Sequence, residues 1–457
     1  MSPMPVAHVA TPSGSRPTEA ARPPRAALEA TLRPTGFGSS ETTLAIARDG
    51  TIFFAPAHTA EGNAVLRSRD GGATWTPLAP RRPDGARHGR TQPFMYLDPV
   101  TERLFFHTGV MGFHPWRFDL RRHRGFHLSW SDDHGDTWNG SLVAQDSLDW
   151  GKLYGGPPVS SSPAGYPNVL YFSAPSPFST PIPPLDTARR QVVRRSLDGG
   201  ASWEKVGSLS LHAADVPGCD RREWVIYGNG VVGRDGAVHL GLRRGARVGV
   251  ATSRSEGRSW TVRDVPGSDL VAYRHWLQVL FVNPNYVLGE PLAIDADGNL
   301  YAHWPAADGR LRLSVSRDGG DTWTRPVVVS APGVTNASCS AATAGAPGTL
   351  AMAYYGSEDG MRFHGYVAES HNALDAEPVF ASVVANDLAD PLFPKGFDGG
   401  YPGIWLGSDL VEIVQVKYHP SGDIWAAFSK DMRRGAWDVR AHGGSKLQGV
   451  AARVRHA

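Results

Sequence analysis

A carboxylate with cationic neighbours is the first candidate for chemistry in this sequence. Glu223 directly follows Asp220, Arg221 and Arg222. A glutamate can donate or accept a proton, and the planar fork of an arginine binds an anionic oxygen pair. We therefore predict catalytic roles for Glu223 and Arg222 and a substrate contact for Asp220. A purely structural lattice of arginines and carboxylates is the alternative.

A second candidate combines a tyrosine, an arginine and a histidine. Tyr273, Arg274 and His275 are consecutive in a long stretch without strand patterning. Tyrosine or histidine can remove a proton next to a uronate carboxylate that arginine binds, which is lyase chemistry. We predict catalytic roles for Arg274 and His275 and a substrate contact for Tyr273. Trp150, in another such stretch, is predicted to stack against a sugar ring, with core packing as the alternative.

A repeated motif supplies the elements that must position these residues. The pattern Ser-x-Asp-x-Gly-x-(Thr/Ser)-Trp occurs four times without error, and a fifth copy has Ser255 where Asp is expected. The closing tryptophans recur about every 62 residues. They are Trp75, Trp138, Trp203, Trp260 and Trp323. Because a short carboxylate followed by glycine closes a tight hairpin, we predict that these aspartates are turn residues rather than catalytic acids.

The surroundings of each motif predict the fold. Alternating apolar runs joined by glycine turns precede every copy, and four strands joined by hairpins make a β-propeller blade. Two further units, around 347–348 and 421–422, lack an intact motif. We predict an all-β protein in which residues 36–457 form a single seven-bladed β-propeller of four-stranded antiparallel blades, with six blades as the alternative. Residues 1–35, rich in Ala, Pro and Arg, are expected to form a disordered tail.

The motif resembles the repeat of the Asp-box, or bacterial neuraminidase repeat, superfamily. That superfamily includes sialidases, other glycosidases and many uncharacterised sialidase-like proteins, and stretches such as 220–224, 351–356 and 404–409 are similar to the uncharacterised group. The resemblance implies a propeller that acts on glycans or binds them. A tyrosine beside a glutamate is the nucleophile pair of sialidases, so the resemblance makes Tyr355 a catalytic candidate.

One departure from the sialidase pattern bears on the substrate. Sialidases carry an Arg-Ile-Pro-like motif in the first blade, and its arginine binds the substrate carboxylate. Residues 35–42 read Thr-Gly-Phe-Gly-Ser-Ser-Glu-Thr and contain no arginine. Because a guanidinium is the group that recognises a carboxylate best, this difference argues against sialic acid as the substrate.

Propeller geometry predicts a second set of site residues. The first residues of the inner strands would lie together at the mouth of a central channel, on the face with the longest connections, where ligands bind. Those residues are Glu41, Gln92, Glu223, Glu290, Asn336 and Asp409. Converging acids could act as acid and base in glycoside cleavage, or could hold Ca²⁺, whereas contact with channel water is the structural alternative. We assign Asp409 a catalytic role and assign Glu41, Gln92 and Glu290 substrate contacts.

Composition limits the partners. The net charge is +2 and no basic run alternates with aromatic residues, so no nucleic-acid partner is expected. No apolar run is long enough to span a membrane, and no metal or cofactor motif is present apart from the Ca²⁺ considered above. We expect Cys219 and Cys339 to be free thiols, and a disulfide bond between them is the alternative. Met1–Pro34 lacks the apolar core of a Sec signal, so the localisation stays open, with the cytoplasm as the default. Separately, we expect a monomer.

Three functions remain open at this stage. The His- and Trp-rich connections favour a glycoside hydrolase that acts on a carbohydrate or other small molecule at the loop-rich face. A polysaccharide lyase on the same scaffold would need histidine or tyrosine beside arginine. A non-catalytic propeller that binds glycan or protein would show aromatic platforms, with its acids paired in salt bridges.

Overall fold

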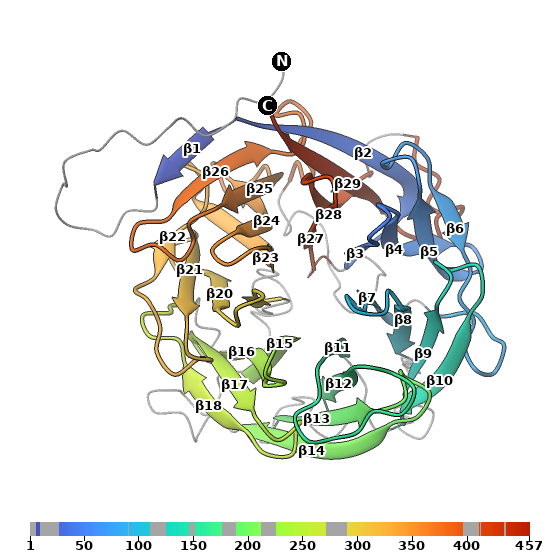
Figure 1. Cartoon of the computed structure of the whole chain (residues 1–457). Helices are drawn as coiled ribbons and strands as arrows, with labels where there is room; N and C mark the ends of the chain where they lie inside the picture. Colours follow the sequence, from blue (N-terminus) through green and yellow to red (C-terminus); the bar gives the residue numbers. More distant parts are fainter. Residues whose placement is uncertain are drawn as a thin grey trace, which may run out of the picture.

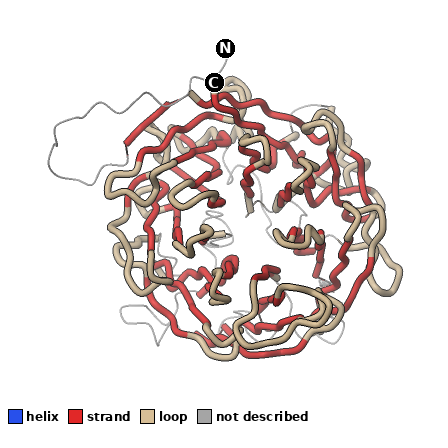
Figure 2. Tube along the Cα trace, viewed as in Figure 1, coloured by secondary structure: helices blue, strands red, loops and turns tan. Residues whose placement is uncertain are grey.

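The structure is a computed structural model that describes most of the chain. It describes residues 6–9, 27–89, 91–109, 125–145, 151–175, 189–211, 225–270, 290–395, 411, 413–433 and 436–457. Within these ranges all regular secondary structure is β-strand, as Figure 2 shows. Over the same ranges, no helix combines the length and the apolar character that a membrane crossing requires.

Antiparallel sheets are arranged side by side around a common axis (Figure 1). Four of them have four strands each, and strands that are consecutive in the chain lie next to one another in the sheet. This is the order that antiparallel strands adopt when each pairs with the next. They contain β7 (Thr91–Leu97), β8 (Leu104–Gly109), β9 (Phe126–Ser131) and β10 (Asn139–Ala144); β11 (Lys152–Gly156), β12 (Val169–Pro175), β13 (Arg189–Ser196) and β14 (Glu204–Leu211); β15 (Val225–Val232), β16 (Val238–Arg244), β17 (Arg247–Ser253) and β18 (Thr261–Asp264); and β19 (Leu292–Ile294), β20 (Leu300–Pro305), β21 (Leu311–Ser316) and β22 (Val327–Val328).

Two further sheets combine strands from distant parts of the chain. The first has the order β1-β26-β25-β24-β23, and the second has the order β27-β28-β29-β2-β4-β5-β6 with β3 paired to β4. Their strands are β1 (Val6–Val9), β23 (Asn336–Ala344), β24 (Leu350–Ser357), β25 (His364–Ser370), β26 (Val379–Val384), β27 (Gln415–Tyr418), β28 (Ile424–Asp431), β29 (Leu447–His456), β2 (Leu28–Gly38), β3 (Thr43–Ile46), β4 (Ile52–Thr59), β5 (Gly62–Ser68) and β6 (Thr76–Leu78). The arrangement is all-β and is consistent with a β-propeller.

The repeated motif forms the hairpin turn between the third and fourth strands of a unit. In the first copy Ser68 Oγ donates to Asp70 Oδ1 at 2.8 Å, and the backbone N–H of Gly72 donates to Ser68 Oγ at 2.8 Å. Thr74 donates to Asp70 from both its N–H, at 2.9 Å, and its hydroxyl, at 2.6 Å. The hydrogen bonds from Thr74 lower the pKa of Asp70 to about 2. The prediction that these aspartates are turn residues is confirmed.

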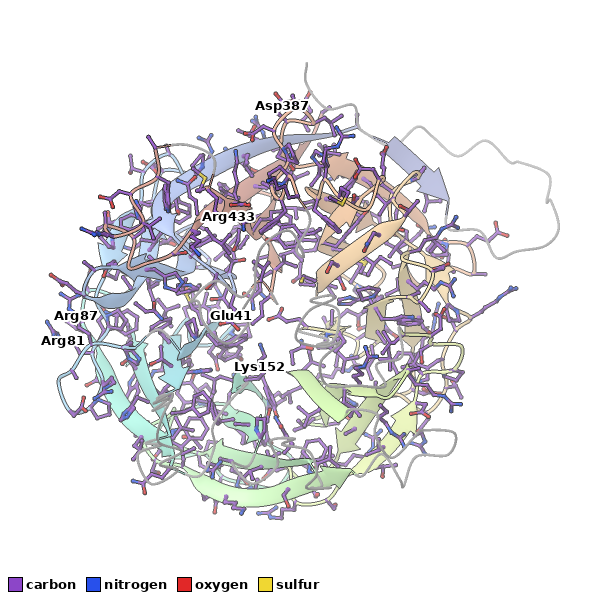
Figure 3. The ribbon with its side chains drawn as sticks, turned by 180° about the vertical axis from the view of Figure 1, so that it is seen from behind. Glu41, Arg81, Arg87, Lys152, Asp387 and Arg433 are labelled. Atoms are coloured by element: carbon purple, nitrogen blue, oxygen red, sulfur yellow. The ribbon has the colours of Figure 1, made fainter. Side chains whose placement is uncertain are left out.

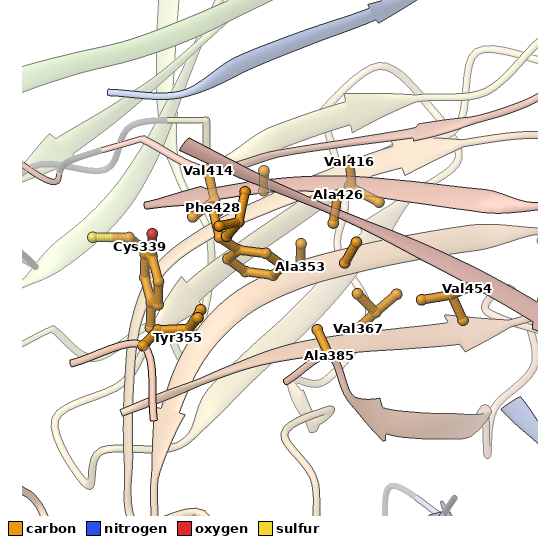
Figure 4. Close-up of a cluster of buried hydrophobic side chains, with 14 of the residues drawn as sticks. Cys339, Ala353, Tyr355, Val367, Ala385, Val414, Val416, Ala426, Phe428 and Val454 are labelled. Carbon is orange, nitrogen blue, oxygen red and sulfur yellow. The ribbon is translucent and has the colours of Figure 1, made fainter. Parts of the chain in front are cut away.

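The core lies between the faces of neighbouring sheets. Figure 4 shows one cluster, in which Tyr355 and Phe428 are fully buried beside Val367 and Val454. Their rings meet edge to face, with centroids 5.4 Å apart. Burial of one such side chain stabilises the fold by about 2 kcal/mol. Packing of this kind holds the inner strands in place and so positions the residues at their ends.

Candidate functional site

The two ends of the sheets differ in what they carry. The motif turns and the hairpins that join first and second strands lie at one end, which we call the turn end. At the opposite end, the mouth, the strands nearest the axis begin; Figure 1 places β3, β7, β11, β15, β23 and β27 nearest that axis. Seen from behind in Figure 3, Glu41 and Lys152 both lie beside the central opening. A site at the mouth would therefore receive one residue from each of several sheets.

Glu41 lies at the mouth, two residues before β3, and is only 5% exposed. Its φ is 54°, a left-handed backbone conformation that non-glycine residues rarely adopt. Such a conformation costs on the order of 1 kcal/mol and persists only where the surroundings hold it. The neighbours of Glu41 on both sides do hold it, and both are buried.

A chain of three polar side chains anchors the residue before Glu41. Ser40 Oγ lies 3.0 Å from His58 Nε2, and His58 Nδ1 lies 2.8 Å from Asn63 Oδ1. The amide nitrogen of Asn63 donates to the Gly89 carbonyl at 2.8 Å, so Asn63 Oδ1 is left to accept a hydrogen bond from His58 Nδ1–H. Nε2 then carries the lone pair and accepts the hydroxyl proton of Ser40.

Thr42 anchors the residue after Glu41. Its hydroxyl donates to the carbonyl of Ala427 in β28 at 3.0 Å. The peptide units on both sides of Glu41 are thus fixed to different strands, one through His58 of β4 and one through β28. The backbone that carries the Glu41 carboxylate is therefore held by groups that do not depend on a ligand.

Glu290 is a second buried carboxylate at the mouth, two residues before β19 and 7% exposed. Gln415, the first residue of β27, donates an amide N–H to Glu290 Oε1. The other end of the same amide, Oε1 of Gln415, accepts the backbone N–H of Leu44 in β3 at 2.7 Å. Gln415 therefore joins the position of Glu290 to the strand that begins next to Glu41.

Lys152 adds a cation to the same end, and sequence reasoning did not select it. It is the first residue of β11 and is 2% exposed, with Nζ 4.6 Å from the centre of the Phe94 ring. Burial, and then the charge of Lys152, lower the pKa of His107 well below its usual value, so this imidazole is neutral. The sequence analysis selected the residues that begin the inner strands but passed over the third unit. The same selection in that unit would have identified Lys152, the first residue of β11.

The structure places three other predicted residues as follows. Asn336 is the first residue of β23 and pairs with Ser357. Gln92 is the second residue of β7, and the Gln92 side chain lies outside the described part of the structure. Tyr355 is fully buried between sheets. Its hydroxyl accepts the Ser429 N–H at 2.7 Å, and it contacts the carbonyl of the same residue at 3.3 Å. These contacts join β24 of the five-stranded sheet to β28 of the eight-stranded sheet through the Tyr355 phenol, and they do not bring Tyr355 to the other candidates.

The remaining predicted residues lie outside the described ranges. They are Trp150, Asp220, Arg222, Glu223, Tyr273, Arg274, His275 and Asp409. Among the predicted site residues that the structure describes, Glu41 and Glu290 are the two buried acids at the same end of the sheets, and Gln415 contacts both Glu290 and Leu44 of β3 there.

Comparisons with known proteins give limited similarity. No protein-family model matches the chain. A xyloglucanase from Paenibacillus sp is 28% identical over 290 residues, which are 57% of this chain and 23% of that protein. The chain thus matches less than a quarter of the relative's length.

Solved structures with a similar arrangement include two sialidases and a lectin. The Hadza microbial sialidase Hz136 has a TM-score of 0.41 and 17% identity, covering 78% of this chain and 66% of its own. NanB sialidase from Streptococcus pneumoniae has a TM-score of 0.42 and 11% identity, covering 92% of both chains. The Aleuria aurantia lectin has a TM-score of 0.42 and 11% identity, covering 73% of this chain and 93% of its own. At these values the likeness assigns no activity.

Proposed function

We propose that this protein is a glycan-active enzyme, a glycoside hydrolase whose active site lies at the mouth. The observation that carries the proposal is the pair of buried carboxylates, Glu41 and Glu290, at the starts of two inner strands. Glycoside cleavage needs two carboxyl groups, one to protonate the leaving oxygen and one to act as base or nucleophile. The named activity of the Paenibacillus xyloglucanase supports a polysaccharide as the substrate class.

We further propose that the sheets form seven blades of the Asp-box type. Inner strands that are neighbours in the ring contact one another in the order β3, β7, β11, β15, β19, β23, β27 and back to β3, which supports seven. The eight-stranded sheet divides naturally between β2 and β4, because these strands share the single register pair Gly38 and His58. By that division β2 completes the last blade and β3 begins the first.

Each carboxylate has a role that its contacts favour. Glu290 Oε1 accepts the amide N–H of Gln415, which holds that oxygen in place, and we assign Glu290 as the base or nucleophile. Glu41, held in its left-handed bend by Ser40 and Thr42, is assigned as the acid that protonates the leaving oxygen. Glu223, Arg222 and Asp409, which precede β15 and β27 in the sequence, stay proposed partners at the same mouth.

Lys152 favours a second candidate, an enzyme or binding protein for acidic sugars. A buried ammonium group would offset the charge of a uronate carboxylate. In that case Arg274 and His275 would serve as the proton-removing pair of a lyase, with Tyr273, Asp220 and Trp150 as further sugar contacts.

Turnover on a substrate panel tests the proposal. Xyloglucan, other neutral glucans, aryl glycosides and uronate polymers are incubated with the full chain, and released reducing ends and unsaturated products are measured separately. We expect reducing-end release that falls at least about 100-fold in Glu41→Gln and in Glu290→Gln. Glu61→Gln is the control, since Glu61 is an exposed acid at the same end that pairs with Arg87. Unsaturated products alone would establish the lyase, and glycan binding without any product would establish a binding protein.

A further inference from the structure

Three side chains with metal-binding atoms meet at the turn end, away from Glu41. Glu369 is the second-last residue of β25, His371 directly follows that strand, and His456 is the last residue of β29. The Nε2 atoms of His371 and His456 each lie 3.2 Å from the same oxygen, Glu369 Oε2. All three atoms lie within 4.8 Å of one another. Two imidazoles and a carboxylate therefore converge on one point, although the chain separates His456 from the other two by several strands.

We propose that Glu369, His371 and His456 bind a divalent transition-metal ion of the Zn²⁺ class. Zinc bonds to histidine nitrogen and carboxylate oxygen are about 2.0–2.2 Å long, so tetrahedral ligand atoms lie about 3.3 Å apart. The two observed nitrogen–oxygen distances match that separation. Two nitrogen ligands and one oxygen ligand suit zinc and its neighbours better than calcium or magnesium, which prefer oxygen alone.

The carboxylate is oriented by a second contact. Glu369 has a side chain that is only 3% exposed, and its other oxygen, Oε1, accepts the hydroxyl of Tyr418 at 3.3 Å. A hydrogen bond of this kind fixes which oxygen faces the metal ligands. Here it directs Oε2 toward the two imidazoles.

The backbone that carries His371 is fixed as well. Ser370 Oγ donates to Asn372 Oδ1 at 3.2 Å, and Asn372 Oδ1 accepts the Val379 N–H at 2.9 Å. Ser370 and Asn372 thus occupy the places of serine and aspartate in the motif turns, and His371 lies between them. A rigid turn reduces the entropy lost when the imidazole is held by a metal.

The location gives the metal a structural role. β25 belongs to the five-stranded sheet, whereas β29 pairs with both β28 and β2 in the eight-stranded sheet. An ion bound by Glu369 and His456 would therefore join two sheets at their turn end. The imidazoles of His371 and His456 are 49% and 42% exposed, so an ion can reach them from solvent and water can complete the coordination. An ion that binds only the folded state raises its stability.

Metal titration of the chelator-treated full chain tests the proposal. Zn²⁺ binding is measured by calorimetry, Co²⁺ serves as the absorbance probe of coordination, and Tm is recorded with and without Zn²⁺. We expect one Zn²⁺ per chain, a tetrahedral Co²⁺ spectrum and a higher Tm with metal. His371→Ala and His456→Ala are each expected to weaken binding at least about tenfold and to abolish the metal-dependent rise in Tm.

His134→Ala is the matched control, because His134 lies at the same end beside one carboxylate, with Nδ1 3.5 Å from Asp49 Oδ2. It should bind Zn²⁺ as the unaltered chain does. The metal-free Tm of each variant shows whether it folds. If the unaltered chain takes up no Zn²⁺, or if both histidine variants bind as it does, the cluster is a hydrogen-bonded ion pair only and the proposal is wrong.

Discussion

Ser40 Oγ lies 3.0 Å from His58 Nε2, and both side chains are buried next to the left-handed bend at Glu41. The serine hydroxyl donates to the histidine, so the interaction holds the peptide unit that precedes Glu41. The same pair of residue types occurs at the turn end, where Ser421 Oγ lies 2.7 Å from His419 Nδ1 in an exposed turn. The Ser40–His58 pair therefore positions the backbone at the mouth, whereas the Ser421–His419 pair stabilises only its own turn.

Replacing the hydroxyl at the mouth should affect catalysis more than stability. Ser40→Ala removes the hydrogen bond to His58 and should lower the free energy of unfolding by about 1 kcal/mol. Under the proposed function, the backbone at Glu41 is held less firmly in this variant, so kcat on the best substrate should fall about tenfold or more with little change in KM. Ser421→Ala is the control and should leave kcat unchanged. An equal kcat in the two variants would show that Ser40 does not position the site.

The backbone at Glu41 makes a prediction about stability alone. A left-handed residue with a Cβ is strained by about 1–2 kcal/mol relative to glycine. Glu41→Gly should therefore have a free energy of unfolding about 1 kcal/mol higher than Glu41→Ala, although both lack the carboxylate and should be inactive. Urea unfolding of the two variants measures the difference. A less stable glycine variant would mean that the bend carries no strain.

Glu256 makes a different kind of contact, between two sheets. Its carboxylate accepts the N–H groups of Val159, Ser160 and Ser161, at 2.8–3.0 Å, and pairs with Arg195. Although burial opposes ionisation, the hydrogen bonds prevail, first among them that of the Ser161 hydroxyl, and lower the pKa of Glu256 to about 2. Glu256→Gln leaves Arg195 without its buried partner and should cost about 3 kcal/mol of unfolding free energy. Glu204→Gln, which removes only the exposed partner of Arg195, should cost much less.

The motif turns predict how stability depends on pH. The pKa values of Asp70, Asp133 and Asp318 are lowered to about 2. At Asp70 and Asp133 the largest cause of the lowered pKa is the hydrogen bond from the hydroxyl of Thr74 or Thr137. At Asp318 burial raises the pKa, but the hydrogen bond from the Thr322 hydroxyl and the other hydrogen bonds outweigh it. A lowered folded-state pKa contributes stability that is present above the ordinary aspartate pKa of about 4 and is lost as the pH falls toward 2.

The triple variant Asp70→Asn, Asp133→Asn, Asp318→Asn tests that dependence. It should be less stable than the unaltered chain at pH 7, and the difference should shrink as the pH falls from about 4 to 2. Urea midpoints at both ends of this range measure the effect. A difference that stays constant would show that the aspartates act without their charge.

Much of this architecture could be predicted because it depends on local chemistry. The turn at Asp70 is specified by residues within a single motif, and the mouth positions of Glu41 and Glu290 follow from counting strands between motifs. The Glu369 and His456 cluster could not be predicted, because its members meet only through packing of distant strands. Tyr355 was selected from the family resemblance alone, and nothing in the sequence around it indicated that its hydroxyl would contact the Ser429 backbone in another sheet.

The pairing of β2 with β29 has a consequence for synthesis of the chain. Leu28 in β2 is aligned with His456 in β29, so β2 acquires this partner only after all the strands between them have been synthesised. Until then one edge of β2 presents unpaired N–H and C=O groups that can recruit other nascent chains. Expression at lower temperature or with chaperones should therefore improve the yield more than any change at the mouth.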